Sequence, residues 1–171
     1  MALHAAEFES ERLRLRWPRL ADAAALFAFM GDADSMRLTQ RLRDLRECRR
    51  YLAAHACQRR KLGYGPWVVL DKSDGRIVGF GGLYDDPFEP GWGIEVSYRF
   101  APAAWGKGYA SELTKFCLTL ASEQLGLGEV KAFALPDNTA SRRVLEKNGF
   151  KQVRFLPAMN RCLYVWRPGP R

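Results

Sequence analysis

Trp105-Gly106-Lys107-Gly108-Tyr109-Ala110 is the stretch from which the rest of the chain is best interpreted. It lies between a run typical of a β-strand, 94–100, and a run typical of a helix, 111–124. Glycines at such a turn let the backbone approach a ligand closely, and the first N–H groups of the helix have no intrahelical acceptor. Such amides form a concave anion site. The stretch therefore predicts a phosphate-binding turn, with a glycine-rich turn that holds no ligand as the alternative.

Outward from this turn, apolar periodicity predicts an alternation of strands and helices. A strand over 11–17, helices over 19–30 and 44–62, and strands over 67–70, 76–84 and 92–100 precede it. A strand over 129–135, a helix over 138–148 and a final hairpin over 150–155 and 162–166 follow it. Asp44 is a suitable N-cap, Asp74-Gly75 a hairpin turn and Gly149 a helix stop. This order is typical of a single mixed α/β domain.

Two segments resemble motifs of the GNAT acyltransferases. The first, Glu95 to Glu112, contains the turn and is similar to the cofactor motif Q/R-x-x-G-x-G/A, with Trp105 in the first position. That substitution is common in the branch that includes the ribosomal-protein N-terminal acetyltransferases (RimJ/RimL-like), and it removes one polar contact expected elsewhere in the family. The second, Asn138 to Phe150, resembles the ending N-x-x-S-x-x-x-L-x-x-x-G-F.

The resemblance implies an α/β, GNAT-like fold. Its sheet is splayed, mixed and mostly antiparallel, with about six to seven strands flanked by about four helices. The whole chain, 1–171, is expected to be one N-acetyltransferase domain. Residues 1–10 and 167–171 are expected to be flexible ends.

The composition is that of a globular chain. Of 171 residues, 47% are hydrophobic, with five Trp and ten Phe, which is enough for one full core. No run approaches the ~20 apolar residues of a membrane helix, and residues 1–10 have no stretch typical of a signal peptide. We therefore expect a cytoplasmic location and no membrane contact. The four cysteines lack zinc-site spacing and only two histidines are present, so we expect mostly buried, reduced thiols and no metal.

Positive charge is concentrated in one segment. Between 41 and 61, eight basic side chains against two acidic ones give +6 of the chain's net +8. The segment is either a solvated helix face, or a surface that meets a ribosomal or acidic partner or attracts a polyanionic cofactor. The sequence leaves open whether the chain is a monomer or a homodimer.

By resemblance, the cosubstrate is acetyl-CoA. Backbone groups near Phe100 and Ala101 would bind its pantetheine arm, and a free N–H there would stabilise the tetrahedral oxyanion. Its phosphates would rest beside Trp105, on Gly106, Lys107, Gly108, Tyr109 and Ala110. The side chain of Lys107 either adds positive charge or is an ordinary solvent-facing lysine. Asn138 either only caps its helix or also contacts the cofactor or the acceptor.

The strand before the turn carries the candidate catalytic groups. Glu95, Ser97 and Arg99 share one face, which predicts an open groove beside a central strand or a solvated face on an edge strand. By resemblance, Glu95 is the general base, acting through a water, with a structural or surface carboxylate as the alternative.

The expected acid for the leaving thiolate comes from the second motif. Many family members have a tyrosine where this chain has Leu145, so that route is absent. By branch resemblance, Ser141, one helical turn earlier on the same face, protonates or hydrogen-bonds the sulfur. Tyr98 and Tyr109 are expected to be packing residues.

These features predict an acetyl-CoA-dependent N-acetyltransferase that acts on a primary amine by direct transfer in a ternary complex. By branch resemblance, the preferred acceptor is a protein or peptide N-terminal α-amine. Acetylation of a small amine, such as a polyamine, an amino acid or an aminoglycoside, is the enzymatic alternative. A non-catalytic module that binds acyl-CoA, or that docks on RNA through the basic segment, is the other alternative.

Overall fold

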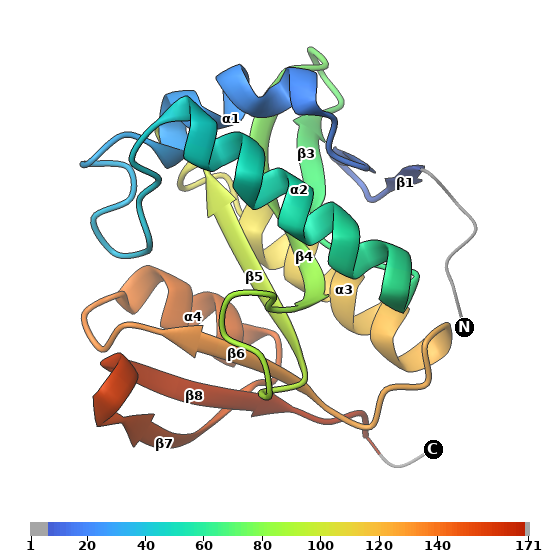
Figure 1. Cartoon of the computed structure of the whole chain (residues 1–171). Helices are drawn as coiled ribbons and strands as arrows, with labels where there is room; N and C mark the ends of the chain where they lie inside the picture. Colours follow the sequence, from blue (N-terminus) through green and yellow to red (C-terminus); the bar gives the residue numbers. More distant parts are fainter. Residues whose placement is uncertain (1–6, 170–171) are drawn as a thin grey trace.

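Eight strands pair into one mixed sheet in the computed structural model, which describes residues 7–169 (Figure 1). The sheet order is β1-β2-β3-β4-β5-β6-β8-β7. Their bounds are β1 Glu7–Glu9, β2 Leu13–Arg16, β3 Trp67–Asp71, β4 Ile77–Asp85, β5 Ile94–Phe100, β6 Val130–Ala134, β7 Lys151–Leu156 and β8 Arg161–Trp166. Neighbouring strands are antiparallel except β5 and β6. The mixed, mostly antiparallel sheet is thus confirmed.

The strand count exceeds the six to seven predicted because β1 lies inside the segment expected to be flexible. Glu7–Glu9 pairs with β2, and Phe8 packs edge-on against Trp67 at 5.7 Å and against Phe116 at 5.6 Å between ring centroids. Three residues carry no readable periodicity, and their aromatic partners lie far along the chain, so the sequence pattern misses this strand. Residues 1–6, also expected to be flexible, lie outside the described part of the chain.

Four α-helices flank the sheet, as predicted: α1 Ala23–Met30, α2 Leu45–Leu62, α3 Tyr109–Glu123 and α4 Thr139–Lys147. The side chain of Asp44 caps α2 by accepting the N–H of Glu47, and Gly63 ends it at φ 82°. The first helix begins later than predicted because 20–22 form a 3₁₀ turn. Among the described residues, no helix has both the length and the apolar character needed to cross a membrane.

The helices form two layers, one on each face of the sheet (Figure 1). On one face, α1 and α2 bury Leu26, Met30 and Leu52 against Val68 and Phe80. On the other face, α3 and α4 pack their buried apolar residues against side chains that alternate with those of the first face, among them Trp67, Val69, Leu83, Val96 and Phe100. Each fully buried side chain of this kind stabilises the fold by about 1.5–3 kcal/mol. Both faces of the central strands are therefore covered.

β4 contains three glycines, Gly79, Gly81 and Gly82. It extends unbroken from Ile77 to Asp85. A Cβ at Gly79 would stand 2.6 Å from the Phe100 ring, and one at Gly82, where φ is 144°, would stand 2.4 Å from the Trp67 ring. The glycines thus give the neighbouring aromatic rings room against the strand.

β5 and β6 meet at one point and then diverge. Their parallel ladder has a single pair, Glu95 opposite Lys131. Beyond it, β5 continues along β4, whereas β6 follows β8, and the two strands separate toward their C-terminal ends (Figure 1). This divergence is the splay expected of the sheet, and it opens a gap in the middle of the molecule.

Candidate active site

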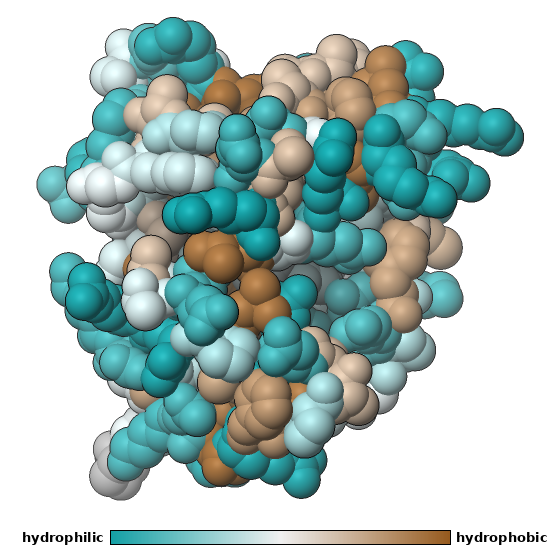
Figure 2. Space-filling model, turned by 90° about the vertical axis from the view of Figure 1, so that its left-hand side faces the viewer, coloured by the Kyte–Doolittle hydropathy of each residue, from teal (hydrophilic) through white to brown (hydrophobic). Residues whose placement is uncertain are grey.

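A cavity of about 960 Å³ occupies the place where β5 and β6 diverge. It is lined by β5, the turn before α3, the start of α4, the loop 35–40 and the segment after β4. Figure 2 shows the face that lies on the left in Figure 1, hollowed near its centre, where apolar side chains are exposed among hydrophilic ones. The size and the mixed lining suit a ligand larger than a metabolite fragment.

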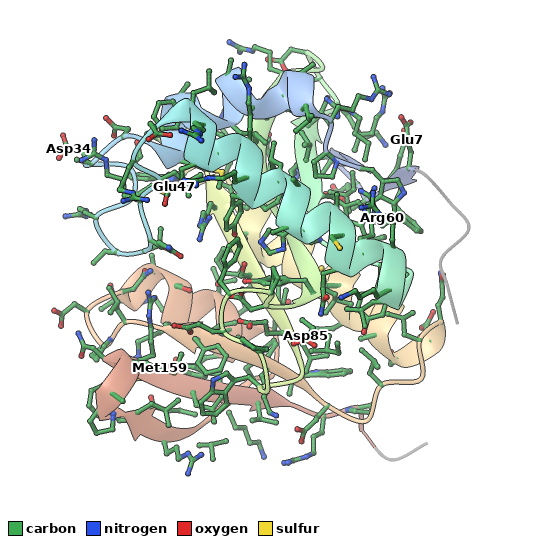
Figure 3. All side chains as sticks on the ribbon, in the orientation of Figure 1. Glu7, Asp34, Glu47, Arg60, Asp85 and Met159 are labelled. Carbon is green, nitrogen blue, oxygen red and sulfur yellow. The ribbon has the colours of Figure 1, made fainter. Side chains whose placement is uncertain are left out.

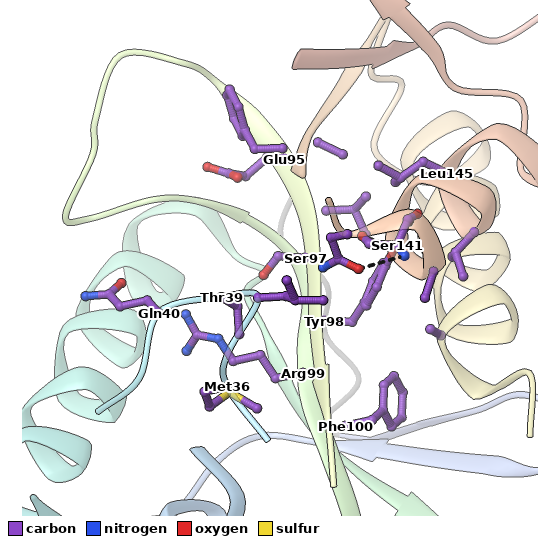
Figure 4. A pocket seen from close by; sticks show the side chains of 18 of the residues that line it. Met36, Thr39, Gln40, Glu95, Ser97, Tyr98, Arg99, Phe100, Ser141 and Leu145 are labelled. Carbon is purple, nitrogen blue, oxygen red and sulfur yellow. Dashed lines mark hydrogen bonds between the residues drawn. The ribbon is translucent and has the colours of Figure 1, made fainter. Parts of the chain in front are cut away.

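The cavity extends around both faces of β5 (Figure 4). Glu95, Ser97 and Arg99 point to the side of α2 and the loop 35–40. Tyr98 and Phe100 point to the opposite side, toward α3, α4 and Ser141. The polar row predicted on this strand therefore lines a groove beside a central strand, and the edge-strand alternative is wrong because β5 lies between β4 and β6.

The glycine-rich turn leaves a row of backbone N–H groups free. Gly106 and Gly108 have φ values of 72° and 80°, which L side chains rarely adopt. Within the described residues, no acceptor bonds the N–H groups of 106–111, because the first helical bond of α3 runs from Glu112 to Gly108. A Cβ at Gly106 would enter open space beside the cavity. The turn therefore fits the phosphates of a coenzyme.

The backbone at the end of β5 differs from the expectation in one respect. The N–H of Ala101 is not free, since it donates to the carbonyl of Val78 at 2.8 Å. In the unbroken antiparallel register with β4, the N–H groups of Tyr98 and Phe100 then point away from β4, toward the gap left by β6. These N–H groups, rather than that of Ala101, are available to a ligand.

Trp105 and Lys107 are placed at the rim of the turn. The indole N–H of Trp105 donates to the carbonyl of Phe100 at 2.8 Å, so it ties the turn to the end of β5. Trp105 lines the cavity, whereas Lys107 and Ala101 are not among the lining residues. The carbonyl of Lys107 accepts a bond from Arg12, and its ammonium lies 6.0 Å from the Tyr109 ring centroid. Tyr109 is buried, as expected of a packing residue, and its hydroxyl donates to Asp71 at 2.6 Å.

A hydroxyl pair faces the cavity on the α4 side. Asn138 caps α4 by accepting the N–H of Ser141 at 3.1 Å, which fixes the serine at the helix start. The hydroxyls of Ser141 and Tyr98 lie 3.0 Å apart. Burial raises the pKa of Tyr98 to about 12, so it stays protonated. Leu145 is buried one turn further along.

Sequence reasoning placed Tyr98 in the packing and missed this pair. The tyrosine and the serine are 43 positions apart, on a strand and a helix that meet only in the fold. One signal was available: Tyr98 lies on the strand that carries Glu95, and strand alternation places it on the opposite face, toward the second motif.

Glu95 is the titratable group that the fold perturbs most clearly in the cavity. Its side chain is 7% exposed, and none of the hydrogen bonds found among residues 7–169 reaches its carboxylate. Burial, followed by the negative charges of Asp86, Glu89 and Asp85, raises its pKa to about 8. A carboxyl group with a pKa near the working pH, beside a cavity, is suited to accept and return a proton. Among residues 7–169, no group of three His, Cys, Asp or Glu is arranged to hold a metal ion.

Comparison with known proteins agrees with this fold. Residues 12–151 match the family described as the acetyltransferase (GNAT) domain. The match spans most of the chain, and the chain therefore belongs to the GNAT acetyltransferase family. In sequence, it is 32% identical over 160 residues to the uncharacterized protein YkkB of Bacillus subtilis (strain 168), covering 92% of each chain.

Solved structures share the same fold. An acetyltransferase from Agrobacterium tumefaciens strain C58 superposes with a TM-score of 0.82 at 22% identity, covering 98% of both chains. Mycobacterium smegmatis RimJ, solved in complex with CoA-disulfide, superposes with a TM-score of 0.72 at 20% identity, covering 91% of this chain and 81% of that one. At these identities the likeness concerns the fold.

Proposed function

We propose that this chain transfers an acetyl group from acetyl-CoA to a primary amine, directly and within a ternary complex. The observation that carries the proposal is the placement of Glu95 and Ser141 on opposite sides of β5, within one cavity. A donor that enters from the side of α3 and α4 and an acceptor that enters from the side of α2 would meet at the gap beside β5. Family membership supports the same reaction class.

The donor half of the site is built mainly from backbone. The free N–H groups of 106–110 would hold the coenzyme phosphates at the N-terminus of α3, where the helix dipole favours negative charge. The N–H groups of Tyr98 and Phe100 would bond the pantetheine arm and the thioester oxygen. Acetyl-CoA supplies the activated acyl group; the chain positions it and excludes water. Asn138 lines the cavity and serves this half as the cap of α4.

Glu95 would manage the proton of the acceptor. A protein α-amine has a pKa of about 8, close to the pKa of about 8 for Glu95, so transfer between them costs little. With both pKa values in that range, a usable fraction of each group is in the reactive form near neutral pH. Since the carboxylate has no hydrogen bond to any of residues 7–169, a water between it and the amine would complete the path.

The leaving thiolate would be stabilised by a hydrogen bond from the pair of Ser141 and Tyr98, and it would take its proton from water once it is released. A serine hydroxyl is a weak acid by itself, and the pKa of Tyr98, raised to about 12, favours the hydrogen-bonded, protonated form. Together the two hydroxyls can donate one hydrogen bond to the sulfur while they keep the other between themselves. A coenzyme thiol has a pKa of about 8.5, so modest help is sufficient.

We infer that the acceptor is a protein or peptide N-terminus. The cavity is open to the molecular surface and is lined in part by the loop 35–40, which leaves room for a chain that continues outside it. A small amine is the second candidate, and one observation favours it: Asp86 and Glu89 line the cavity near Glu95, and their charges attract a cationic acceptor.

Coenzyme A release from acetyl-CoA, measured with free-N-terminal peptides and with small primary amines, tests the proposal. Peptide turnover that disappears when the α-amine is blocked supports an N-terminal acetyltransferase. Turnover in the small-amine pool alone supports an acetyltransferase that acts on small molecules. Coenzyme binding without turnover in either pool supports a non-catalytic module instead.

The basic segment 41–61 has its charges on the outer side of α2. Arg46, Arg49, Arg50, Arg60 and Lys61 are all exposed, and Figure 3 shows Arg60 near the C-terminal end of the helix. These side chains lie outside the cavity lining, so they do not contact the acceptor's reactive end. We propose that this face docks an acidic surface, such as that of a ribosome, during acetylation. Binding that weakens steeply between 50 and 200 mM salt, about as expected for counterion release, would support the role.

A further inference from the structure

Arg99 is a cation inside the acceptor half of the cavity with no ion pair among residues 7–169. Its Nη1 atom is buried and has no hydrogen-bond acceptor in the described part of the chain. The guanidinium lies over the Tyr51 ring, 5.1 Å from its centroid, which holds it against α2. Burying a charge without a partner is costly, so such a group is expected where a ligand supplies the partner.

The side chains beside Arg99 do not neutralise it, and the carboxylates of Asp86 and Glu89, which line the same cavity, form no ion pair with it among residues 7–169. His55 is buried, and burial, with the charge of Arg99, lowers the pKa of His55 to about 3, so the imidazole is neutral. Tyr51 is buried, and burial raises the pKa of its hydroxyl, so it is neutral as well. Glu95 is mostly protonated near neutral pH because its pKa is about 8. The guanidinium therefore keeps an uncompensated positive charge at the cavity lining.

The direction of Arg99 defines where a ligand group would lie. In Figure 4, the side chain extends from the Glu95 face of β5 toward Thr39 and Gln40, which also line the cavity. Thr39 and Gln40 carry a hydroxyl and an amide that can donate to the same anion. A carboxylate accepts two parallel hydrogen bonds from a guanidinium, which is the strongest neutral-pH pairing available to arginine.

We propose that Arg99 binds a carboxylate of the acceptor and so selects peptides with an acidic side chain near the third residue. This inference rests on the proposed acetyl transfer to an N-terminal amine. Residues 95 and 99 are four positions apart on one strand face, which places their Cα atoms about 13 Å apart. The carboxylate of an α-amino acid lies within about 4 Å of its own amine, which is well short of this backbone spacing.

A peptide has the required reach. Extended residues advance about 3.3–3.6 Å each, so the third side chain leaves the backbone about 7 Å from the first Cα and extends further outward. With its α-amine beside Glu95, an Asp or Glu at that position would reach the Arg99 guanidinium. A long ω-amino acid offers the same two groups at similar spacing and is the other source of the carboxylate.

The experiment compares matched acceptors with wild-type, Arg99→Gln and Arg99→Lys proteins. Peptides that differ only in Glu, Gln or Lys at position three are assayed for kcat/KM, together with ω-amino acids and their uncharged amides. We expect the wild type to prefer the Glu peptide over the Gln peptide by about 10- to 100-fold. Arg99→Gln should bring that ratio to within about threefold of one, and Arg99→Lys should fall between. A larger charge preference among ω-amino acids than among peptides would identify the small molecule as the source.

Binding to the coenzyme-saturated protein, measured by calorimetry, separates this inference from the proposed function. Charge-dependent binding that is lost in Arg99→Gln, without turnover of any acceptor, supports the carboxylate subsite and refutes the transfer reaction. Turnover without a charge preference in the wild type overturns the subsite alone, even if Arg99→Gln does not fold. Arg154→Gln removes an exposed arginine outside both the cavity and the basic segment, and it should keep the preference.

Discussion

The two sides of β5 are built in different ways. On the donor side, the ligand groups are backbone amides of a glycine turn and a helix N-terminus, whose geometry is fixed by positive φ values and by the absence of helical acceptors. On the acceptor side, the groups are the side chains Glu95 and Arg99, whose properties depend on burial and on neighbouring charges. In the proposed mechanism, backbone groups would hold the cosubstrate, whereas side chains would provide selectivity and proton transfer.

The largest expected effect comes from the acceptor side. Glu95→Gln keeps the shape of the side chain but cannot accept a proton, so we expect kcat to fall by about 10²- to 10⁴-fold. Acetyl-CoA affinity should change less than about threefold because the residue faces away from the donor half. Steady-state kinetics with calorimetry checks both. A parallel loss of coenzyme binding would contradict the separation of the two sides.

Changing the donor side should raise the KM for acetyl-CoA with a smaller effect on kcat. Gly106→Val places a branched side chain at φ 72°, in space that a phosphate would occupy, and we expect KM to rise about 10- to 100-fold. Gly126→Val is the matched control, since that glycine also has positive φ, 63°, with open space around it, but lies outside the cavity lining. It should lose similar stability without a change in KM. An equal rise in KM in both variants would show that the turn at Gly106 does not bind the coenzyme.

The pH dependence sharpens the role of Glu95. The carboxyl must lose its proton to act as a base, so kcat/KM rises with pH and levels off above its pKa of about 8. From pH 8 to pH 7, the deprotonated fraction, and with it the rate, should fall about fivefold from this group alone. The acceptor amine titrates in the same direction, so the Glu95→Gln protein provides the amine-only profile. Identical profiles for the two proteins would show that Glu95 does not control the rate.

The same shift affects stability. The folded-state pKa of Glu95 lies above its ordinary value of 4.5, so the folded protein holds the proton more tightly than the unfolded chain. The stabilising contribution is complete below about pH 4.5 and is lost as pH rises toward 8. The free energy of unfolding of wild type and of Glu95→Gln can be measured by chemical denaturation across this window. The advantage of the Gln protein should grow with pH, to on the order of a few kcal/mol. If the difference in unfolding free energy between the two proteins did not change with pH, the pKa of Glu95 would not be raised, and its carboxyl group would be better solvated than the structure indicates.

The smallest expected effect concerns the hydroxyl pair. Tyr98→Phe and Ser141→Ala should each lower kcat by about 3- to 10-fold, because a thiolate with a pKa of about 8.5 leaves with modest help. The hydroxyls lie 3.0 Å apart, so the double variant should lose less than the product of the two single effects. Multiplicative losses in the double variant would show that the hydroxyls act independently.

Much of the fold follows from local sequence patterns. Apolar periodicity, the Asp44 cap, the turn at Gly75 and the stop at Gly149 fix where the main strands and helices begin and end, because each depends on residues a few positions apart. The glycine turn and the polar row on β5 were readable for the same reason. β1 was not, because a three-residue strand is stabilised by the contacts of Phe8 with Trp67 and Phe116.

The chemistry of the site depends on contacts between distant segments. The pairing of β5 with β4 makes the N–H of Ala101 donate to the carbonyl of Val78. The placement of α4 brings Ser141 to Tyr98. The pKa of Glu95 is raised by burial and by the carboxylates of Asp85, at the end of β4, and of Asp86 and Glu89, just after it. Local sequence patterns therefore determine the helices and strands and carry the motifs of the family. The divergence of β5 from β6 gives the side chains of distant segments a common cavity. Only the tertiary structure decides their chemistry, because burial and charge depend on neighbours in space.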